Sequence, residues 1–270
     1  MLVAETRSPN AKAIRTVSSS AEEEAFHLYE ANLDGSGLRQ LTDGPFDDLD
    51  PIYLPDGGIA FVSTRTQTYV RCMPYTFVYT LCRMDGDGSN IRVLSHNNEP
   101  DWTPSLLDDG RVIYSRWEYT DKALWRIQSL WTVRPDGTDH AAFYGNQSVW
   151  PDHLGEARQI PGTSKVMFTG LAHHNYFAGS VGIIDPTRGS NYPAGLTQIT
   201  REIDWPECGR GPNDDDIALL GYQHRGRKGD YKSPFPLAED LFLVSINTGP
   251  FNLYLMDTRG NRELIYRGQH

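Results

Sequence analysis

Apolar and polar residues alternate along this chain in short runs, and each run ends in a turn signal. The stretch 28–65 holds four such runs, and the same order of runs and turns recurs towards the C-terminus. Alternation bounded by Gly, Pro, Asn and Asp predicts β-strands, and a four-strand repeat of about 50 residues is typical of a β-propeller blade. We therefore expect an all-β protein of four-stranded blades, with strands a to d in chain order.

The turns between strands c and d define the period of the repeat, because an Asp-Gly pair supplies the backbone conformation of a tight hairpin turn. Successive turn glycines lie 53, 49, 52 and 71 residues apart, at Gly35, Gly88, Gly137, Gly189 and Gly260. The predicted complete blades span about residues 50–95, 102–144, 157–200 and 234–267. A partial blade at 27–42 follows an irregular segment, 1–26, in which Ala13–Val17 could form a strand.

Four complete blades and part of a fifth favour a piece of a six- or seven-bladed ring that is truncated at both ends. The alternative is a ring of fewer blades that is closed by residues 1–20.

Loop length differs between the two ends of the predicted blades. The a–b and c–d turns are short, whereas long b–c loops cover 65–77 and 117–128, and the longest d–a crossover covers 201–233. Long loops on a rigid scaffold often carry binding residues. The sequence therefore predicts a ligand-binding face at the b–c/d–a end. Its candidate residues are Arg65, Arg116, Trp117, Glu118, His153, His173, His174 and Trp205.

Two groups within this set suggest specific chemistry. His153, His173 and His174 could bind a divalent metal, since imidazole is a common ligand of transition metals. The alternative is that one histidine packs on a blade and another makes a structural hydrogen bond. Arg116 and Glu118 could face a ligand, or they could form an internal ion pair that fastens the loop.

The cysteines and the net charge narrow the possible classes of protein and their locations. Cys72 and Cys82 could form a disulfide, and no CxxCH motif for haem attachment occurs. The net charge of −10 argues against nonspecific nucleic-acid binding, and no apolar run is long enough to span a membrane. The N-terminal segment lacks the apolar core of a signal peptide. This predicts either a cytoplasmic protein or part of a longer exported one.

The repeats resemble those of a known family. Residues 33–65, LDGSGLRQLTDGPFDDLDPIYLPDGGIAFVSTR, are similar to the TolB-type WD-like propeller repeat. Further runs, including RMDGDGSNIRVLS, GRVIYSRWEY and FNLYLMDTRGNRELIYR, resemble the propeller domain of hydrazine synthase alpha subunits and their relatives. The resemblance implies a six-bladed propeller within an exported multidomain protein, located in the periplasm or secreted. Haem chemistry is not implied, because this chain has no CxxCH motif.

These observations favour a non-catalytic binding or scaffold domain whose partner is a protein, a small molecule or a glycan. One alternative is a metal-dependent propeller enzyme such as a polysaccharide lyase, using the three histidines. The other is the propeller portion of a haem-containing redox complex.

Overall fold

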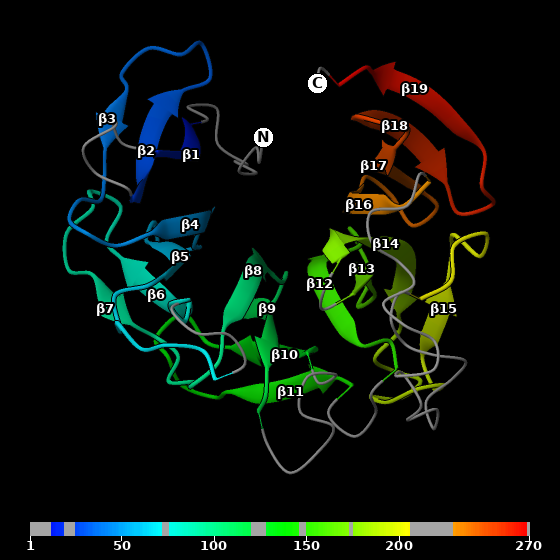
Figure 1. The fold of residues 1–270 in the computed structure, drawn as a ribbon, viewed down its shortest axis with the longest axis horizontal. Helices are drawn as coiled ribbons and strands as arrows, with labels where there is room; N and C mark the ends of the chain where they lie inside the picture. The colour runs from blue at the N-terminus through cyan, green and yellow to red at the C-terminus, as the bar shows by residue number, and fades with distance from the viewer. Residues whose placement is uncertain are drawn as a thin grey trace. The chain divides into compact units, whose positions relative to one another are not determined.

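The computed structural model shows a protein made of β-strands and turns (Figure 1). It describes residues 12–18, 25–71, 76–119, 128–145, 150–172, 175–205 and 229–268. These residues include no helix, and hence none long and apolar enough to cross a membrane. The prediction of an all-β chain is confirmed.

The chain divides into two compact units. Unit 1 comprises Met1–Val112 and Val133–His140, and unit 2 comprises Ile113–Thr132 and Ala141–His270. The division falls within the predicted blade at 102–144, whose a strand and c–d turn belong to unit 1.

Unit 1 contains two antiparallel sheets and strand β8. The first sheet has the order β1 (Lys12–Ser18), β2 (Phe26–Asn32) and β3 (Arg39–Gln40). The second has the order β4 (Asp48–Tyr53), β5 (Ile59–Ser63), β6 (Thr80–Met84) and β7 (Arg92–Val93). Strand β8 (Asp101–Leu106) packs near β4, β5 and β6. Leu28 and Leu41 of the first blade meet Ile59, Phe61 and Met84 of the second in one buried cluster.

Unit 2 continues the same strand order. It holds most of β9 (Val112–Trp117) and β10 (Gln128–Val133), together with β11 (Ala141–Tyr144). The next blade is β12 (His153–Gln159), β13 (Val166–Ala172), β14 (Asn175–Ile184) and β15 (Leu196–Gln198). The last is β16 (Tyr231–Pro236), β17 (Leu241–Asn247), β18 (Phe251–Asp257) and β19 (Arg262–Tyr266).

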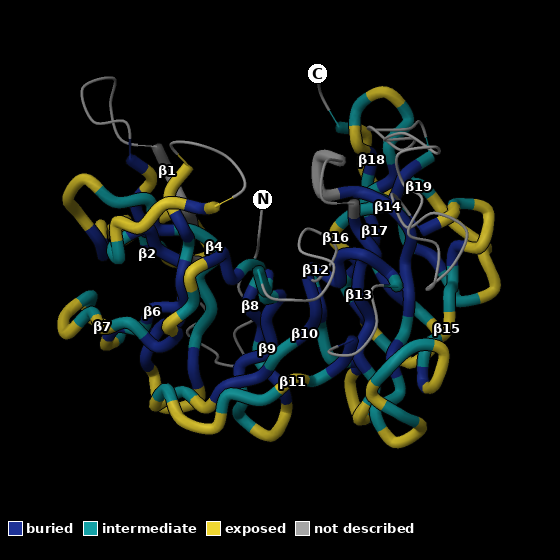
Figure 2. Tube along the Cα trace, turned by 60° about the horizontal axis from the view of Figure 1, so that its bottom comes forward, coloured by how far each residue is buried: buried dark blue, intermediate teal, exposed yellow. Residues whose placement is uncertain are grey.

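Alternation along β17 shows how the blades of unit 2 stack. Phe242, Val244 and Ile246 are buried, and they pack with Met167 and Val181 of the preceding blade. The residues that alternate with them are half-buried, namely Leu241, Leu243, Ser245 and Asn247. One face of the last sheet therefore forms a core with its neighbour. Figure 2 shows buried residues along the strands and exposed residues concentrated in the turns.

The inner a strands share a bend. Asp50, Thr103, Glu156 and Ser233 are the non-glycine residues of these strands with positive φ, between 48° and 54°. The pairing register shifts at this bend in β4, β12 and β16. The bends in these three strands are thus β-bulges, which bend the strand and take a backbone group out of the ladder. In unit 2, Ser233 donates its backbone N–H and its hydroxyl to the Glu156 carboxylate of the preceding blade, at 2.6 and 2.7 Å.

The c–d turns fasten each blade to the one before it in unit 1. Gly88 has φ of +93°, and a Cβ there would lie 2.6 Å from the carbonyl oxygen of Leu41. Gly137 lies against Leu94, the residue 53 positions after Leu41, but less tightly, since a Cβ there would lie 3.4 Å from the Leu94 side chain. Glycine is therefore required at Gly88 for both its backbone conformation and its close contact.

Most predicted strands are present, and their boundaries need some correction. The possible strand at Ala13–Val17 exists as β1 and pairs with β2, so the first blade has three strands where the sequence indicated a two-stranded hairpin. The a strand of the predicted blade at 157–200 starts at His153, whereas the sequence placed its start at Ala157. The bulge between Gly155 and Arg158 breaks the alternation that would reveal the early part.

Candidate functional site

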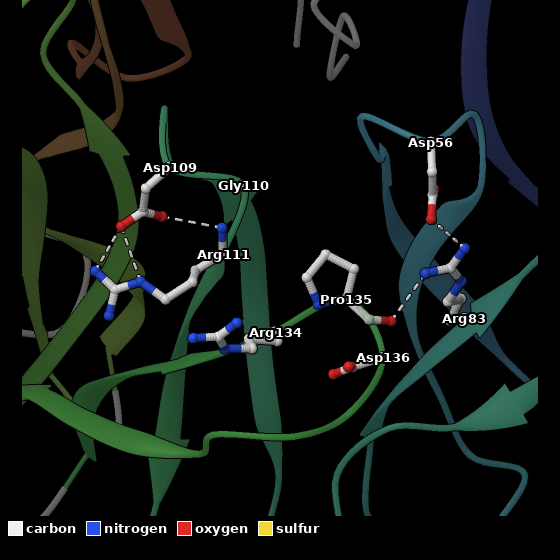
Figure 3. A pocket seen from close by; sticks show the side chains of 8 residues that line it. All are labelled: Asp56, Arg83, Asp109, Gly110, Arg111, Arg134, Pro135 and Asp136. Atoms are coloured by element: carbon white, nitrogen blue, oxygen red, sulfur yellow. Dashed lines mark hydrogen bonds and ion pairs between the residues drawn. The ribbon is translucent and has the colours of Figure 1, made fainter.

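Unit 1 carries a hollow of about 440 Å³ among its tight turns (Figure 3). It is lined by an a–b turn and β6 of one blade and by both turns of the next. The lining residues are Asp56, Arg83, Asp109, Gly110, Arg111, Arg134, Pro135 and Asp136. Three arginines and three aspartates thus surround one space at the a–b/c–d end.

The turns that position these residues follow from local sequence. An aspartate carboxylate accepts the backbone N–H two residues further on, as Asp56 does from Gly58, Asp109 from Arg111 and Asp136 from Thr138. Such Asx turns hold the loop without help from the strands. Each carboxylate is therefore fixed at the rim of the hollow by its own turn.

Arg83 is the most enclosed cation of the hollow, with 13% of its side chain exposed. Its Nη2 donates to Asp56 Oδ2 at 2.6 Å, and its Nη1 donates to the carbonyl oxygen of Pro135 at 3.0 Å. One guanidinium thus joins the a–b turn of its own blade to the c–d turn of the next.

Arg111 folds back on its own turn. Its Nε and Nη2 donate to Asp109 Oδ2 at 2.9 and 2.7 Å. This fork pairs the guanidinium with a single carboxylate oxygen on one wall of the hollow.

Arg134 is differently placed. Its Nε donates to Asp139 Oδ2 at 3.3 Å, and both side chains are more than half exposed. Among the described residues, no hydrogen bond uses Arg134 Nη1 or Nη2. Asp136 accepts from Thr138 through Oδ1, and its Oδ2 has no hydrogen-bond partner among the same residues. Arg134 and Asp136 therefore retain binding capacity at the hollow.

The three carboxylates are ionised at neutral pH. A hydrogen bond from Arg83 lowers the pKa of Asp56, and one from Arg111 lowers the pKa of Asp109. Hydrogen bonds from the Thr138 side chain and backbone lower the pKa of Asp136. Because the arginines are also charged, the lining carries three charges of each sign.

The residues predicted at the b–c/d–a end are largely engaged in the structure. Arg65 Nη2 donates to the buried Asp48 carboxylate at 2.8 Å, and its guanidinium lies 4.8 Å from the centre of the Phe46 ring. Arg116 lies over the rings of Tyr114 and Trp131, at 5.5 and 5.2 Å. Both cations have structural partners.

Trp117 and Glu118 lie beside Arg116 in the chain. Trp117 is buried, and its ring meets that of Tyr119 edge-on. Glu118 Oε2 is buried and accepts no hydrogen bond from the residues that the structure describes. Of the eight candidates, Glu118 is therefore one that keeps an acceptor for a ligand.

The proposed metal ligands are described only in part. His153 is buried at the start of β12, and His173 and His174 lie outside the described residues. The described residues contain no group of three metal-ligating side chains. The three-histidine site stays a prediction. Trp205 is buried, stacks on Phe168 at 5.7 Å and fills the space beside Gly170.

Cys82 is buried in β6, and burial raises its pKa to about 12. Cys72 lies outside the described residues, so the disulfide between them stays a prediction.

Sequence reasoning missed the hollow, although a signal exists. An arginine lies shortly before the turn glycine of two successive c–d hairpins, with Arg83 five residues before Gly88 and Arg134 three residues before Gly137. It also missed Glu99, a buried carboxylate in a d–a crossover that faces Arg71. Arg71 donates its backbone N–H to Glu99 Oε1, and Glu99 Oε2 has no hydrogen-bond partner within the described part of the chain.

No protein-family model matches the chain, and no curated protein matches it. Solved structures do match. Hydrazine synthase of Kuenenia stuttgartiensis is 19% identical, with a TM-score of 0.73 over 95% of this chain and 37% of the other. Putative TolB from Agrobacterium tumefaciens is 13% identical, with a TM-score of 0.58 over 88% of this chain and 73% of the other. The tricorn protease is 14% identical, with a TM-score of 0.52 over 88% of this chain and 20% of the other.

The fold is a TolB-like β-propeller. The resemblance predicted from the repeats is confirmed at the level of fold. The chain spans about a third of the length of the hydrazine synthase chain that it matches.

Proposed function

We propose that this chain is a non-catalytic β-propeller binding domain of a longer exported protein, and that the charged hollow of unit 1 is its binding site. The fold supports the first part, since propellers of this kind occur within longer chains such as hydrazine synthase, of which this chain covers 37%. The proposed location is the periplasm or the exterior, and the proposed partner is a small polar molecule, a glycan or a protein.

The proposal that the hollow is the binding site rests on one observation. Arg134 and Asp136 border it with a guanidinium edge and a carboxylate oxygen that no described residue occupies. Unused donors and acceptors in a concave site are what orient a polar ligand.

The lining favours binding over catalysis. It holds no Ser, Cys, His or Lys that could act as a nucleophile or as a base near neutral pH. Its carboxylates have lowered pKa values, so they are poor proton acceptors. What remains is recognition by charge and hydrogen bonds.

The b–c/d–a end is the rival location. Arg65 and Asp48 there already pair with each other, and Trp117 and Trp205 are buried. Glu118 keeps an unpartnered oxygen, so its substitution provides a direct comparison with the hollow.

Thermal unfolding in the presence of ligands tests the proposal. The purified chain is screened against charged small molecules and oligosaccharides, since a ligand that binds the native state raises the unfolding temperature. We expect at least one compound to stabilise the wild type and the Glu118→Gln variant, and to have little effect on Arg134→Gln. If the response disappears in Glu118→Gln and persists in Arg134→Gln, the site lies at the b–c/d–a end. If no compound stabilises the chain, the proposed small-ligand site is wrong.

A further inference from the structure

The charges that line the hollow balance, but the charged side chains are not equally available to a ligand. Asp56 with Arg83 and Asp109 with Arg111 form closed ion pairs, with N–O distances of 2.6 and 2.7 Å. A ligand that used either pair would first have to separate it.

The third arginine and the third aspartate do not pair with each other. Arg134 reaches Asp139 through Nε alone, at 3.3 Å, and Asp136 turns one oxygen to Thr138. Arg134 is 61% exposed and Asp139 is 55% exposed, and an ion pair so open to water contributes little to stability. A ligand can therefore replace this contact at little cost.

Arg134 and Asp136 come from the same turn, two residues apart, and Figure 3 shows both beside the space between the two closed pairs. The turn presents two donor nitrogens of a positive group and one acceptor oxygen of a negative group to the same hollow. A complementary ligand has a planar anionic acceptor and, a short distance away, a cationic donor. A carboxylate suits the guanidinium edge, which can donate to both of its oxygens.

We infer that the hollow binds a zwitterion of the α-amino acid type, with its carboxylate on Arg134 and its ammonium on Asp136. This inference rests on the proposed function and adds the ligand class. The volume of about 440 Å³ lies within the range of small-molecule sites and leaves room for a side chain beside the backbone groups.

Either charged group of the ligand should bind more weakly without the other. A simple anion on Arg134 would face Asp136 and Asp139, and a simple cation on Asp136 would face Arg134. Like charges at such distances oppose binding. A zwitterion meets both residues with opposite charge.

The test uses L-alanine, N-acetyl-L-alanine and L-alaninamide as probes, which present both charges, the carboxylate alone and the ammonium alone. Binding is followed by NMR through the backbone amides of Gly137 and Thr138. We expect L-alanine to bind with a millimolar dissociation constant and each single-charge analogue to bind about fivefold more weakly, as the loss of one exposed ion pair implies.

Two variants and a matched control complete the design. Asp136→Asn removes the charge and keeps an oxygen for the Thr138 contact, and Arg134→Gln removes the cation. Each should weaken L-alanine binding about fivefold. Arg259→Gln, in the corresponding c–d turn of the last blade, should leave the affinity unchanged.

Other outcomes overturn the inference. Equal binding of N-acetyl-L-alanine would show an anion site, equal binding of L-alaninamide would show a cation site, and failure of all three probes would exclude the ligand class. If another compound still stabilises the chain in an Arg134-dependent manner, the ligand class is wrong and the proposed site stands. If no compound stabilises the chain in this way, both the ligand class and the proposed site are wrong.

Discussion

Arg83 Nη1 donates a hydrogen bond to the carbonyl oxygen of Pro135, across 52 residues of sequence and from one blade to the next. The same guanidinium pairs with Asp56, so it connects two turns at once. Because both contacts lie in unit 1, they tie the segment 133–140 to β6.

Replacing Arg83 should loosen this connection. Arg83→Gln is expected to reduce the free energy of unfolding by about 1–2 kcal/mol, since it removes charged hydrogen bonds from a largely enclosed side chain. Arg92→Gln, on exposed β7, should change it by less than about 0.5 kcal/mol. Urea unfolding of the three proteins provides the measurement, and equal midpoints would show that the bridge contributes nothing.

The Arg83→Gln substitution should also change how the stability of the protein depends on pH. Arg83 lowers the pKa of Asp56, so this pair stabilises the protein above the ordinary Asp pKa, and the stability is lost as pH falls through the lower, folded-state value. Arg83→Gln should therefore lose less stability than wild type on acidification in that range.

Alanine substitutions at two turn glycines should distinguish the cost of backbone strain from the cost of steric crowding. Gly35 and Gly88 are equivalent and have φ of +85° and +93°, but a Cβ at Gly35 meets nothing within 4 Å. Gly35→Ala should cost about 1–2 kcal/mol through backbone strain. Gly88→Ala should cost a further 1–3 kcal/mol or so, because its Cβ would crowd the Leu41 carbonyl oxygen. Thermal unfolding of the two variants measures the difference, and similar losses would contradict the tight packing of blade on blade.

Glu99 should make the protein less stable as pH rises. Burial raises its pKa, so its stabilising contribution is present below the ordinary Glu pKa and is lost as pH increases through the raised value. Glu99→Gln is expected to stabilise by about 1 kcal/mol at pH 7 and to have little effect near pH 4, because it removes a buried charge with one unpaired oxygen. Unfolding from pH 4 to 8 tests this, with exposed Glu263→Gln as the control. A constant difference across pH would refute the assignment.

The two sides of β17 should respond differently to truncation. Phe242→Ala is expected to cost about 3–5 kcal/mol, because it opens a cavity in the core with Met167 and Val181. Leu243→Ala, on the half-buried side, should cost less than about 2 kcal/mol. Chemical denaturation of the matched pair measures both, and equal costs would place a second core on the Leu243 side.

The sequence predicted the strands most accurately where Asp-Gly turns bound them. Strand β11 runs from Ala141 to Tyr144 as expected, since the turn at Asp136-Gly137 fixes the preceding hairpin. The a strands were harder to delimit. Bulges at Glu156 and Ser233 shift the alternation within β12 and β16, so a simple period of two fails there.

The site was less predictable than the strands. Loop length directed attention to the b–c/d–a end, where the pairing of Arg65 with Asp48 depends on contacts 17 residues apart. The hollow depends on contacts as far apart as Arg83 and Pro135, and its turns are short. In the sequence the short turns indicated only where strands end, whereas the packing of neighbouring blades in unit 1 brings the charges of these turns to one place.

The bend in the inner strands has a consequence for tracing the history of such repeats. Aspartate, threonine, glutamate and serine occupy the same left-handed position in four blades, at residues 50, 103, 156 and 233. The architecture therefore preserves a backbone conformation while the side chain varies freely. Repeats that diverged long ago would be recognised better by a dihedral angle at this position than by any residue found there.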